Sequence, residues 1–223
     1  MPELPEVETT RRGIEPHVCG GKIREVIVRR RDLRQPIPSE IDSLVGRKFR
    51  KVGRRSKYLL LEIDDGRRLL IHLGMSGSLR VISPADDWKK HDHVGITLSN
   101  GKQLRFHDPR RFGLVLLIDG DPERHPLLCH LGPEPLEDDF TVEYLKAACE
   151  KRKAAIKQVI MDASVVVGVG NIYASEALFR AGILPRTPAC KLTKPRIEKL
   201  AGAPAESPAN TPTAPWAVSV VVR

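Results

Sequence analysis

Short runs rich in Val, Ile and Leu, separated by polar turn residues, occupy the chain between residues 22 and 118. The turn dipeptides Asp65-Gly66 and Asn100-Gly101 lie between such runs, and both favour tight turns that join antiparallel strands. This pattern predicts an antiparallel β-sandwich or barrel. The expected strands lie in KIREVIVRR, RKFRKVGRR, KYLLLEI, RRLLIHLG, GSLRVI, HVGITLS, KQLRFHD and GLVLLI.

The residues on either side of these runs have helical patterns instead. Residues 7–19 predict a first helix, which ends at the glycine pair Gly20-Gly21. Past the strands, Pro133 and Pro135 interrupt the β pattern, and helices are expected from there on. They are predicted over 141–152 with Thr141 as N-cap, over 153–161, and as two pieces around Gly168-Val169-Gly170 within 162–185.

These patterns divide the chain into three parts. Residues 1–131 are expected to form a domain of one helix and a β-sandwich, and residues 132–200 an incomplete helical domain. Residues 201–223 carry four prolines and little charge, which predicts a disordered tail. The expected fold class is therefore a multidomain α and β protein.

The charge favours a polyanionic partner. The 223 residues include 37 Lys and Arg against 28 Asp and Glu, a net charge of +9. Nucleic acid fits this balance best, although a ribosomal or membrane-surface protein has similar composition. No run of 18 apolar residues exists, so no membrane span is expected. The acidic start carries no signal-peptide pattern, which favours a cytoplasmic protein.

The four cysteines give no metal or disulfide pattern. Cys19, Cys129, Cys149 and Cys190 are widely spaced and form no C-x-x-C pair. We expect reduced thiols and no metal bound by this chain.

Pro2 and Glu3 are the first candidates for chemistry. Removal of Met1 leaves Pro2 with a secondary amine, and α-amino groups titrate at roughly 7.7 to 8.0, so the amine is a usable nucleophile near neutral pH. Taken alone, Pro2 is better explained as the start of a helix, and Glu3 is better explained as a solvated acid at that start.

Six motifs in order change this interpretation. They are MPELPEVE at the start, GRRSKYLLLE at 53–62, IHLGMSGSLR at 71–80, HDHV at 91–94, DPRRFG at 108–113 and VGVGNIYASEALFRAGILP at 167–185. Together they resemble the formamidopyrimidine-DNA glycosylase family, bacterial base-excision enzymes for oxidised purines. The resemblance extends from Pro2 to about Leu200 and implies a helix-two-turn-helix motif in the second domain.

The resemblance also implies catalytic roles. Pro2 is expected to form a Schiff base with the sugar, and Glu3 to act as general acid. The family's lysine that matches Lys57 donates a proton during β-elimination, although a flanking surface lysine is the simpler explanation of this residue. Glu6 and Glu176 match supporting carboxylates, and Glu176 is equally compatible with a helix surface.

The DNA-contact residues follow in the same way. Met75, Arg110 and Phe112 match the side chains that fill the gap left when the damaged nucleotide is flipped out of the duplex. His91, Arg110, Arg152 and Asn171 match positions that bind DNA, mainly its phosphates. Position 152 is usually lysine, a change that preserves the charge.

The end of the chain departs from the family. Family members continue past residue 200 into a zinc finger, whose Zn²⁺ ligands have no counterpart here, so a truncation or a frame change is expected. The sequence therefore predicts a monomeric glycosylase and abasic-site lyase, whose partner is double-stranded DNA with oxidised bases or abasic sites. Two alternatives stay open: an endonuclease VIII-like enzyme for oxidised pyrimidines, and a DNA-binding remnant without catalysis.

Overall fold

The computed structural model describes residues 2–202, which form two compact units. The first unit comprises Pro2 and residues 6–128, and the second comprises Glu3–Pro5 and residues 129–202. The sequence places this division at 131/132 and assigns Glu3–Pro5 to the first part. Of the predicted tail, residues 203–223 lie outside the described residues, and Ala201 is the last residue of a helix.

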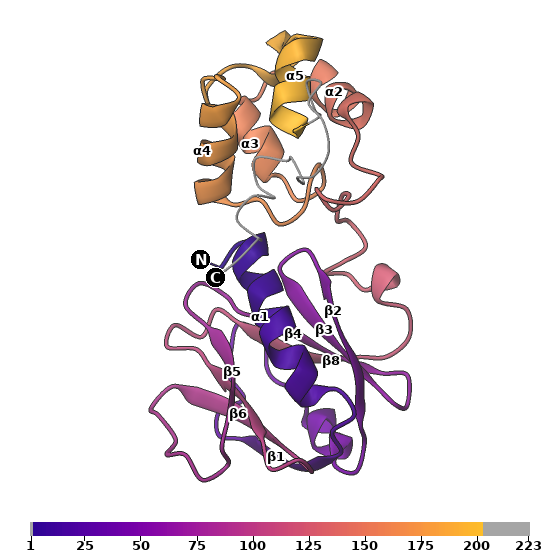
Figure 1. The fold of residues 1–223 in the computed structure, drawn as a ribbon, viewed down its shortest axis with the longest axis vertical. Coiled ribbons are helices and arrows are strands. Elements are labelled where there is room, and N and C mark those ends of the chain that lie inside the picture. The colour runs from indigo at the N-terminus through magenta and orange to yellow at the C-terminus, as the bar shows by residue number, and fades with distance from the viewer. Residues whose placement is uncertain (1, 203–223) are drawn as a thin grey trace. The chain divides into compact units, whose positions relative to one another are not determined.

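The first unit is a β-sandwich of two four-stranded antiparallel sheets (Figure 1). One sheet has the order β1-β6-β7-β5 and the other β2-β3-β4-β8. Each of the eight predicted runs contains one strand, so the predicted fold class is confirmed. The strands are β1 (Ile23–Val28), β2 (Phe49–Arg55), β3 (Tyr58–Ile63), β4 (Arg68–His72), β5 (Ser78–Ile82), β6 (Asp92–Leu98), β7 (Gln103–His107) and β8 (Leu114–Ile118).

Alternation along the strands builds the core between the sheets. In β3, Leu59 and Leu61 are buried, and they lie opposite Ile71 and Leu69 of β4. Side chains two residues apart face the same side of a strand, so one face of each sheet is apolar. Gly66 has a φ of +91° in the turn between β3 and β4, which explains why the Asp-Gly dipeptide marks this hairpin.

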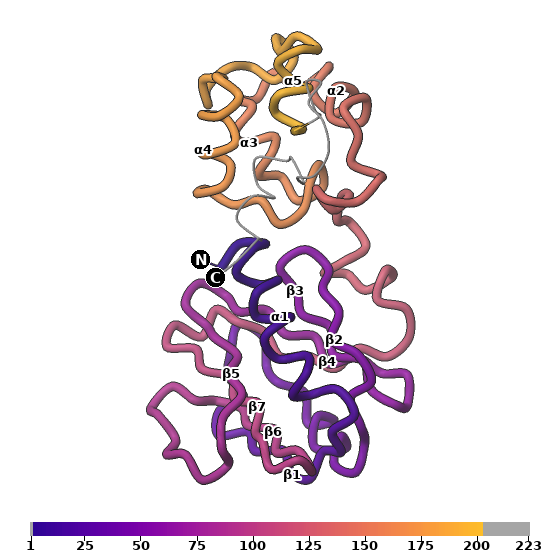
Figure 2. The backbone as a smooth tube through the Cα atoms, in the orientation of Figure 1, coloured from indigo at the N-terminus to yellow at the C-terminus, as the bar shows by residue number. Residues whose placement is uncertain are grey.

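Helix α1 (Leu4–Val18) lies alongside the sandwich and contributes Val7, Ile14 and Val18 to its core (Figure 2). The helix begins three residues earlier than the pattern predicts, because proline fits a first helical turn and Pro5 does not delay the start. A 3₁₀ helix, η1 (Ser39–Leu44), adds two further core residues and was not predicted.

The second unit contains four α-helices within the described residues, α2 (Val142–Glu150), α3 (Ile156–Met161), α4 (Asn171–Arg180) and α5 (Lys194–Ala201), and one 3₁₀ helix, η3 (Ala189–Lys191). The hydroxyl of Thr141 accepts a hydrogen bond from the N–H of Tyr144 (3.0 Å), which confirms the predicted N-cap of α2. Leu145, Ile160 and Leu200 are among the side chains that form a separate apolar core. Helix α5 was not predicted.

The prediction of two helix pieces around the glycine turn was wrong. Only α4 forms, and residues 162–168 make turns. The Asp162 carboxylate accepts hydrogen bonds from the backbone N–H and the hydroxyl of Ser164, at 2.9 and 2.7 Å. Such local side-chain bonds compete with helix formation, and the three β-branched residues Val165, Val166 and Val167 add to this preference.

Candidate active site

The Glu3 carboxylate is buried at the N-terminus of α4. One oxygen accepts from the N–H of Ile172 (3.0 Å), and the other accepts from Gly170 (3.0 Å) and Tyr173 (3.1 Å). The side chain is 3% exposed. The two carboxylate oxygens thus meet three N–H donors at the start of a helix, where the helix dipole favours an acidic side chain.

Two glycines make this arrangement possible. A Cβ at Gly170 would lie 2.3 Å from Cδ of Glu3, and one at Gly168 would lie 2.4 Å from a methyl carbon of Leu4. Gly168 also has a φ of +80°, and its carbonyl accepts a hydrogen bond from the N–H of Leu4 (3.1 Å). The glycine turn thus holds the residues that directly follow Pro2.

This geometry corrects one expectation about the same helix. The sequence suggests that exposed N–H groups at the glycine turn receive a DNA phosphate. Those of Gly170, Ile172 and Tyr173 instead donate to Glu3. Asn171, the predicted phosphate ligand, is exposed at the first position of α4 and takes no part in these three bonds.

Lys57 lies in the tight turn between β2 and β3, as its position before an apolar strand suggests. The preceding residue, Ser56, has a φ of +54°, and its carbonyl accepts a hydrogen bond from the Arg54 guanidinium (2.9 Å). A backbone conformation that is rare for serine is thus fixed by a neighbouring side chain.

His72, which the sequence did not single out, is a neighbour of this turn. Its ring lies 4.9 Å from that of Tyr58, and its Nδ1 accepts a hydrogen bond from the N–H of Gly74 (3.0 Å). Burial, with the positive charges of Arg34 and Lys57, lowers the pKa of His72 to about 4. The ring is therefore neutral at pH 7, with Nε2 as its donor. Its position at the end of a strand, just before the glycine-rich LGMSG segment, was the available signal.

Two loops bring the predicted gap-filling residues together. A Cβ at Gly74 would lie 2.6 Å from the backbone of Phe112 and Gly113, so the Met75 loop contacts the DPRRFG loop directly. Met75 and Phe112 are 40% and 45% exposed, which is unusual for large apolar side chains in a folded unit. The Arg110 guanidinium lies over the Phe112 ring, 5.1 Å from its centre.

A buried carboxylate shapes the DPRRFG loop. Asp108 is fully buried and accepts hydrogen bonds from the N–H groups of Gly113 (2.8 Å) and Arg110 (3.3 Å). Its carbonyl is 2.8 Å from Nε2 of His93. These bonds fix the loop from inside and leave its side chains to face outward.

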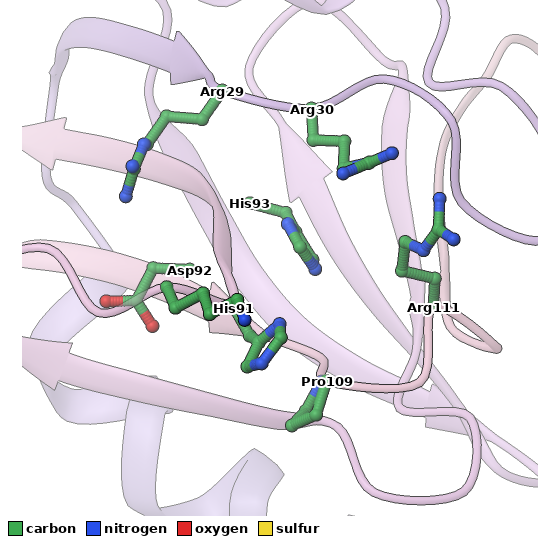
Figure 3. A pocket seen from close by; sticks show the side chains of 8 residues that line it. Arg29, Arg30, His91, Asp92, His93, Pro109 and Arg111 are labelled. Carbon is green, nitrogen blue, oxygen red and sulfur yellow. The ribbon is translucent and has the colours of Figure 1, made fainter.

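His91 lies in a hollow of about 400 Å³ in the same unit (Figure 3). Its ring meets those of His93 and His107 edge-on, with centres 6.4 and 6.0 Å apart. Partial burial and the charge of Lys90 lower the pKa of His91. The hollow is lined by Arg29, Arg30, Lys90, His91, Asp92, His93, Pro109 and Arg111.

The remaining candidates are exposed. Arg152, in the second unit, forms an ion pair of 3.0 Å with Asp162, the residue that fixes the turn before the glycines. Glu176 is exposed on α4, and Glu6 is exposed on α1. For Glu176 the surface interpretation therefore stays open.

Two wider features bear on function. Within residues 2–202 no group of three or more His, Cys, Asp or Glu side chains is placed to hold a metal ion. In the same part of the chain, no helix combines the length and the apolar character needed to cross a membrane.

Comparisons with known proteins match both units. The model of the formamidopyrimidine-DNA glycosylase N-terminal domain matches residues 1–115, and that of the formamidopyrimidine-DNA glycosylase H2TH domain matches residues 131–206. A formamidopyrimidine-DNA glycosylase of Thioalkalivibrio sulfidiphilus is 57% identical over 201 residues, which are 90% of this chain and 74% of the relative. One of Xanthomonas euvesicatoria is 56% identical over 205 residues, 91% of this chain and 75% of the relative.

Solved structures show the same similarity. The Lactococcus lactis formamidopyrimidine-DNA glycosylase, non-covalently bound to DNA with an abasic site, has a TM-score of 0.83 at 33% identity and covers 89% of this chain and 77% of its own. The Thermus thermophilus MutM (Fpg) protein has a TM-score of 0.79 at 38% identity, and the match covers 90% of this chain and 72% of the Thermus protein. A sandwich followed by a helix-two-turn-helix unit, with this degree of identity, defines a DNA glycosylase fold. The chain belongs to the formamidopyrimidine-DNA glycosylase family.

Proposed function

We propose that this chain is a bifunctional DNA glycosylase and abasic-site lyase. It removes oxidised purines, such as 8-oxoguanine and formamidopyrimidines, from double-stranded DNA and nicks the strand by β-elimination. Family membership supports this, as do the complexes of the Lactococcus lactis relative with abasic-site DNA and with Fapy-dG DNA. The observation that carries the proposal is the anchored Glu3 carboxylate directly after Pro2.

The chemistry begins at Pro2. Its amine attacks C1′ of the flipped nucleotide and the bond from C1′ to the base breaks, so that the base leaves with the electron pair and takes a proton from water. Glu3 accepts the proton that the bound amine loses and, as the general acid, delivers it to O4′ when the bond from C1′ to O4′ breaks, which opens the sugar ring. A secondary amine gives a permanently charged iminium, which draws electrons from C2′. Loss of a C2′ proton then expels the 3′ phosphate, and Lys57 serves as the proton donor to that leaving group.

Flipping the nucleotide costs a few kcal/mol of stacking and pairing, which other contacts must offset. Met75, Phe112 and Arg110 are proposed to fill the gap. Two exposed apolar groups stack between bases, and a guanidinium meets the widowed base. The close approach of their two loops, at Gly74 and at Phe112 and Gly113, supports a joint role.

The backbone of the DNA is proposed to bind at His91, Arg110, Arg152 and Asn171. Arg152 already carries an acidic partner, Asp162, so a phosphate there competes with an existing ion pair. We further propose that the protein acts as a monomer in the bacterial cytoplasm, in association with the nucleoid, since each reaction concerns a single lesion in chromosomal DNA.

A trapping experiment tests the proposal. Borohydride reduces the iminium to a stable amine, so wild-type protein incubated with an abasic-site or 8-oxoguanine duplex should give a covalent adduct. Pro2→Gly should lose most of this adduct and still bind the duplex, whereas Pro84→Gly, a change at an exposed loop proline, should trap like wild type. Intact mass should show that Met1 is removed.

The two alternatives give different results in this assay. An endonuclease VIII-like enzyme would process a duplex with an oxidised pyrimidine faster than the 8-oxoguanine duplex. A remnant without catalysis would bind duplex DNA and form no adduct, even with Met1 removed.

A further inference from the structure

Asp32 joins two arginines beside the hollow that contains His91. One carboxylate oxygen lies 2.7 Å from Nε of Arg30, and the other lies 2.7 Å from a terminal nitrogen of Arg111. The two guanidiniums come from different segments, one after β1 and one from the DPRRFG loop. Figure 3 shows them on the same side of the hollow. All three side chains are exposed.

The backbone at Arg111 explains how this side chain reaches the hollow. Its φ is +56°, a left-handed conformation that is rare for arginine and costs free energy. The Asp108 carboxylate holds the residues on both sides of it, Arg110 and Gly113. As a result, Arg110 lies over Phe112, and Arg111 is directed to Asp32 instead.

The rest of the hollow is cationic as well. Arg29 and Lys90 line it together with the two arginines, and the ring of His91 adds a polar group to the lining. Among its described lining residues the acid is Asp92, which is buried and already bound. Asp92 accepts from Arg80 (2.8 Å), from the backbone N–H of Lys89 (3.0 Å) and lies 2.8 Å from Nδ1 of His107. The hollow therefore offers positive charge to an anion.

We propose that this hollow binds a DNA backbone phosphate, and that Asp32 occupies the place of that phosphate in the DNA-free protein. The proposal rests on the proposed function, since it takes damaged duplex DNA as the ligand. A guanidinium fork fits carboxylate and phosphate oxygens equally well, so a carboxylate held between two arginines marks a position that fits a phosphate. DNA binding then exchanges Asp32 for the phosphate at Arg30 and Arg111.

The exchange predicts that removal of Asp32 strengthens DNA binding. The ligand for the test is a duplex with a tetrahydrofuran abasic-site analogue, and the Kd is measured from 50 to 200 mM salt. Asp32→Asn should bind three- to ten-fold more tightly than wild type. Asp121→Asn is the matched control, because it removes the same charge from another exposed acid in the same unit, one that lies 3.8 Å from Arg124.

Substitutions of the two arginines form the second part of the binding test. Arg111→Asn should weaken binding three- to ten-fold and reduce the slope of log K against log salt by about one, the effect of losing one phosphate contact. Asparagine is chosen because it tolerates the left-handed backbone. When Arg30→Gln and Arg111→Asn are both present, Asp32→Asn should bring no gain beyond that of Asp121→Asn.

Two outcomes would overturn the exchange: equal gains for Asp32→Asn and Asp121→Asn, or a gain that persists without the two arginines. If the wild-type protein traps an abasic site but the variants give either of these results, the proposed function stands and this inference fails. Single methylphosphonate linkages, placed in turn on each strand, identify the bound phosphate, because a neutral linkage there should abolish the Asp32→Asn gain. If Asp32→Asn still binds more tightly than wild type wherever the methylphosphonate linkage is placed on either strand, that result would also contradict the proposal.

Discussion

Replacement of Gly170 by alanine should disconnect Glu3 from α4. The new Cβ would lie 2.3 Å from Cδ and 2.4 Å from Oε1 of Glu3, far inside van der Waals contact. The obstructing atoms are the end of a side chain, so the backbone need not move and the carboxylate swings away instead. The cost is then the loss of the hydrogen bonds to Gly170, Ile172 and Tyr173.

The expected magnitude follows from those bonds. A hydrogen bond to a charged group contributes about 1.5–3 kcal/mol, and part of it is recovered when the displaced carboxylate meets water. We expect Gly170→Ala to lower the free energy of unfolding by about 2–4 kcal/mol, which shifts a urea midpoint by roughly 1–2 M. Borohydride trapping should fall with it, because the Glu3 carboxylate is no longer held in place for its proposed role as general acid.

A double-mutant cycle tests the cause. Glu3→Ala removes the obstructing side chain, so Glu3→Ala with Gly170→Ala should be no less stable than Glu3→Ala alone. Gly13→Ala is the control, because its Cβ meets nothing within 4 Å and alanine within a helix should stabilise by about 0.5–1 kcal/mol. The reasoning is wrong if the losses in free energy of unfolding of the two single variants simply add in the double variant. It is also wrong if Gly170→Ala has the urea midpoint and the adduct yield of the wild type.

Three further predictions concern exposure and pH. Phe112→Ala should change stability by less than about 1 kcal/mol, because the ring is 45% exposed, yet reduce excision from lesion duplexes at least ten-fold; an unfolded variant would contradict this. Glu8 has a pKa of about 2, because hydrogen bonds from Arg11 and Arg12 outweigh the effect of burial. Its folded pKa lies below its unfolded one, so it stabilises the fold above about pH 4.5, by up to about 3 kcal/mol. That stability is lost as the pH falls towards 2, and Glu8→Gln should flatten the loss in acid denaturation. His72 has a folded pKa of about 4, so the unfolded chain binds the extra proton and stability should fall by up to about 3 kcal/mol from pH 6.5 to 4. His72→Gln should remove that slope, and an unchanged profile would refute the assignment.

The strands could be predicted because their signals are local. Alternating apolar residues such as Leu59 and Leu61, and turns such as Asn100-Gly101, depend on neighbours in sequence alone. Residues 162–167 were predicted wrongly because the hydrogen bonds that Ser164 donates to Asp162, and the low helix propensity of three β-branched valines, override a weak helical pattern. Helix α5 is short and gains its stability from packing of Ile197 and Leu200, which periodicity alone does not reveal.

The candidate site was predictable as a set of residues and not as a geometry. The motifs identify Glu3, but its bonds to Gly170, Ile172 and Tyr173 join positions 167 to 170 residues apart, and no local pattern encodes them. The same holds for Asp32, which meets Arg111 across 79 residues of sequence. Neighbouring motif residues can also face different surroundings, as the left-handed backbone at Arg111 shows.

The bonds between Glu3 and the start of α4 also set an order of events during synthesis. Ribosomes add about 5–20 residues per second, so the partners of Glu3 emerge roughly 8–35 s after it does. Throughout that interval the first residues of the nascent polypeptide stay open to the enzymes that trim initiator methionine. Removal of Met1 can thus precede the anchoring of Glu3, and a chain that stalls before α4 lacks the three N–H groups that hold this carboxylate.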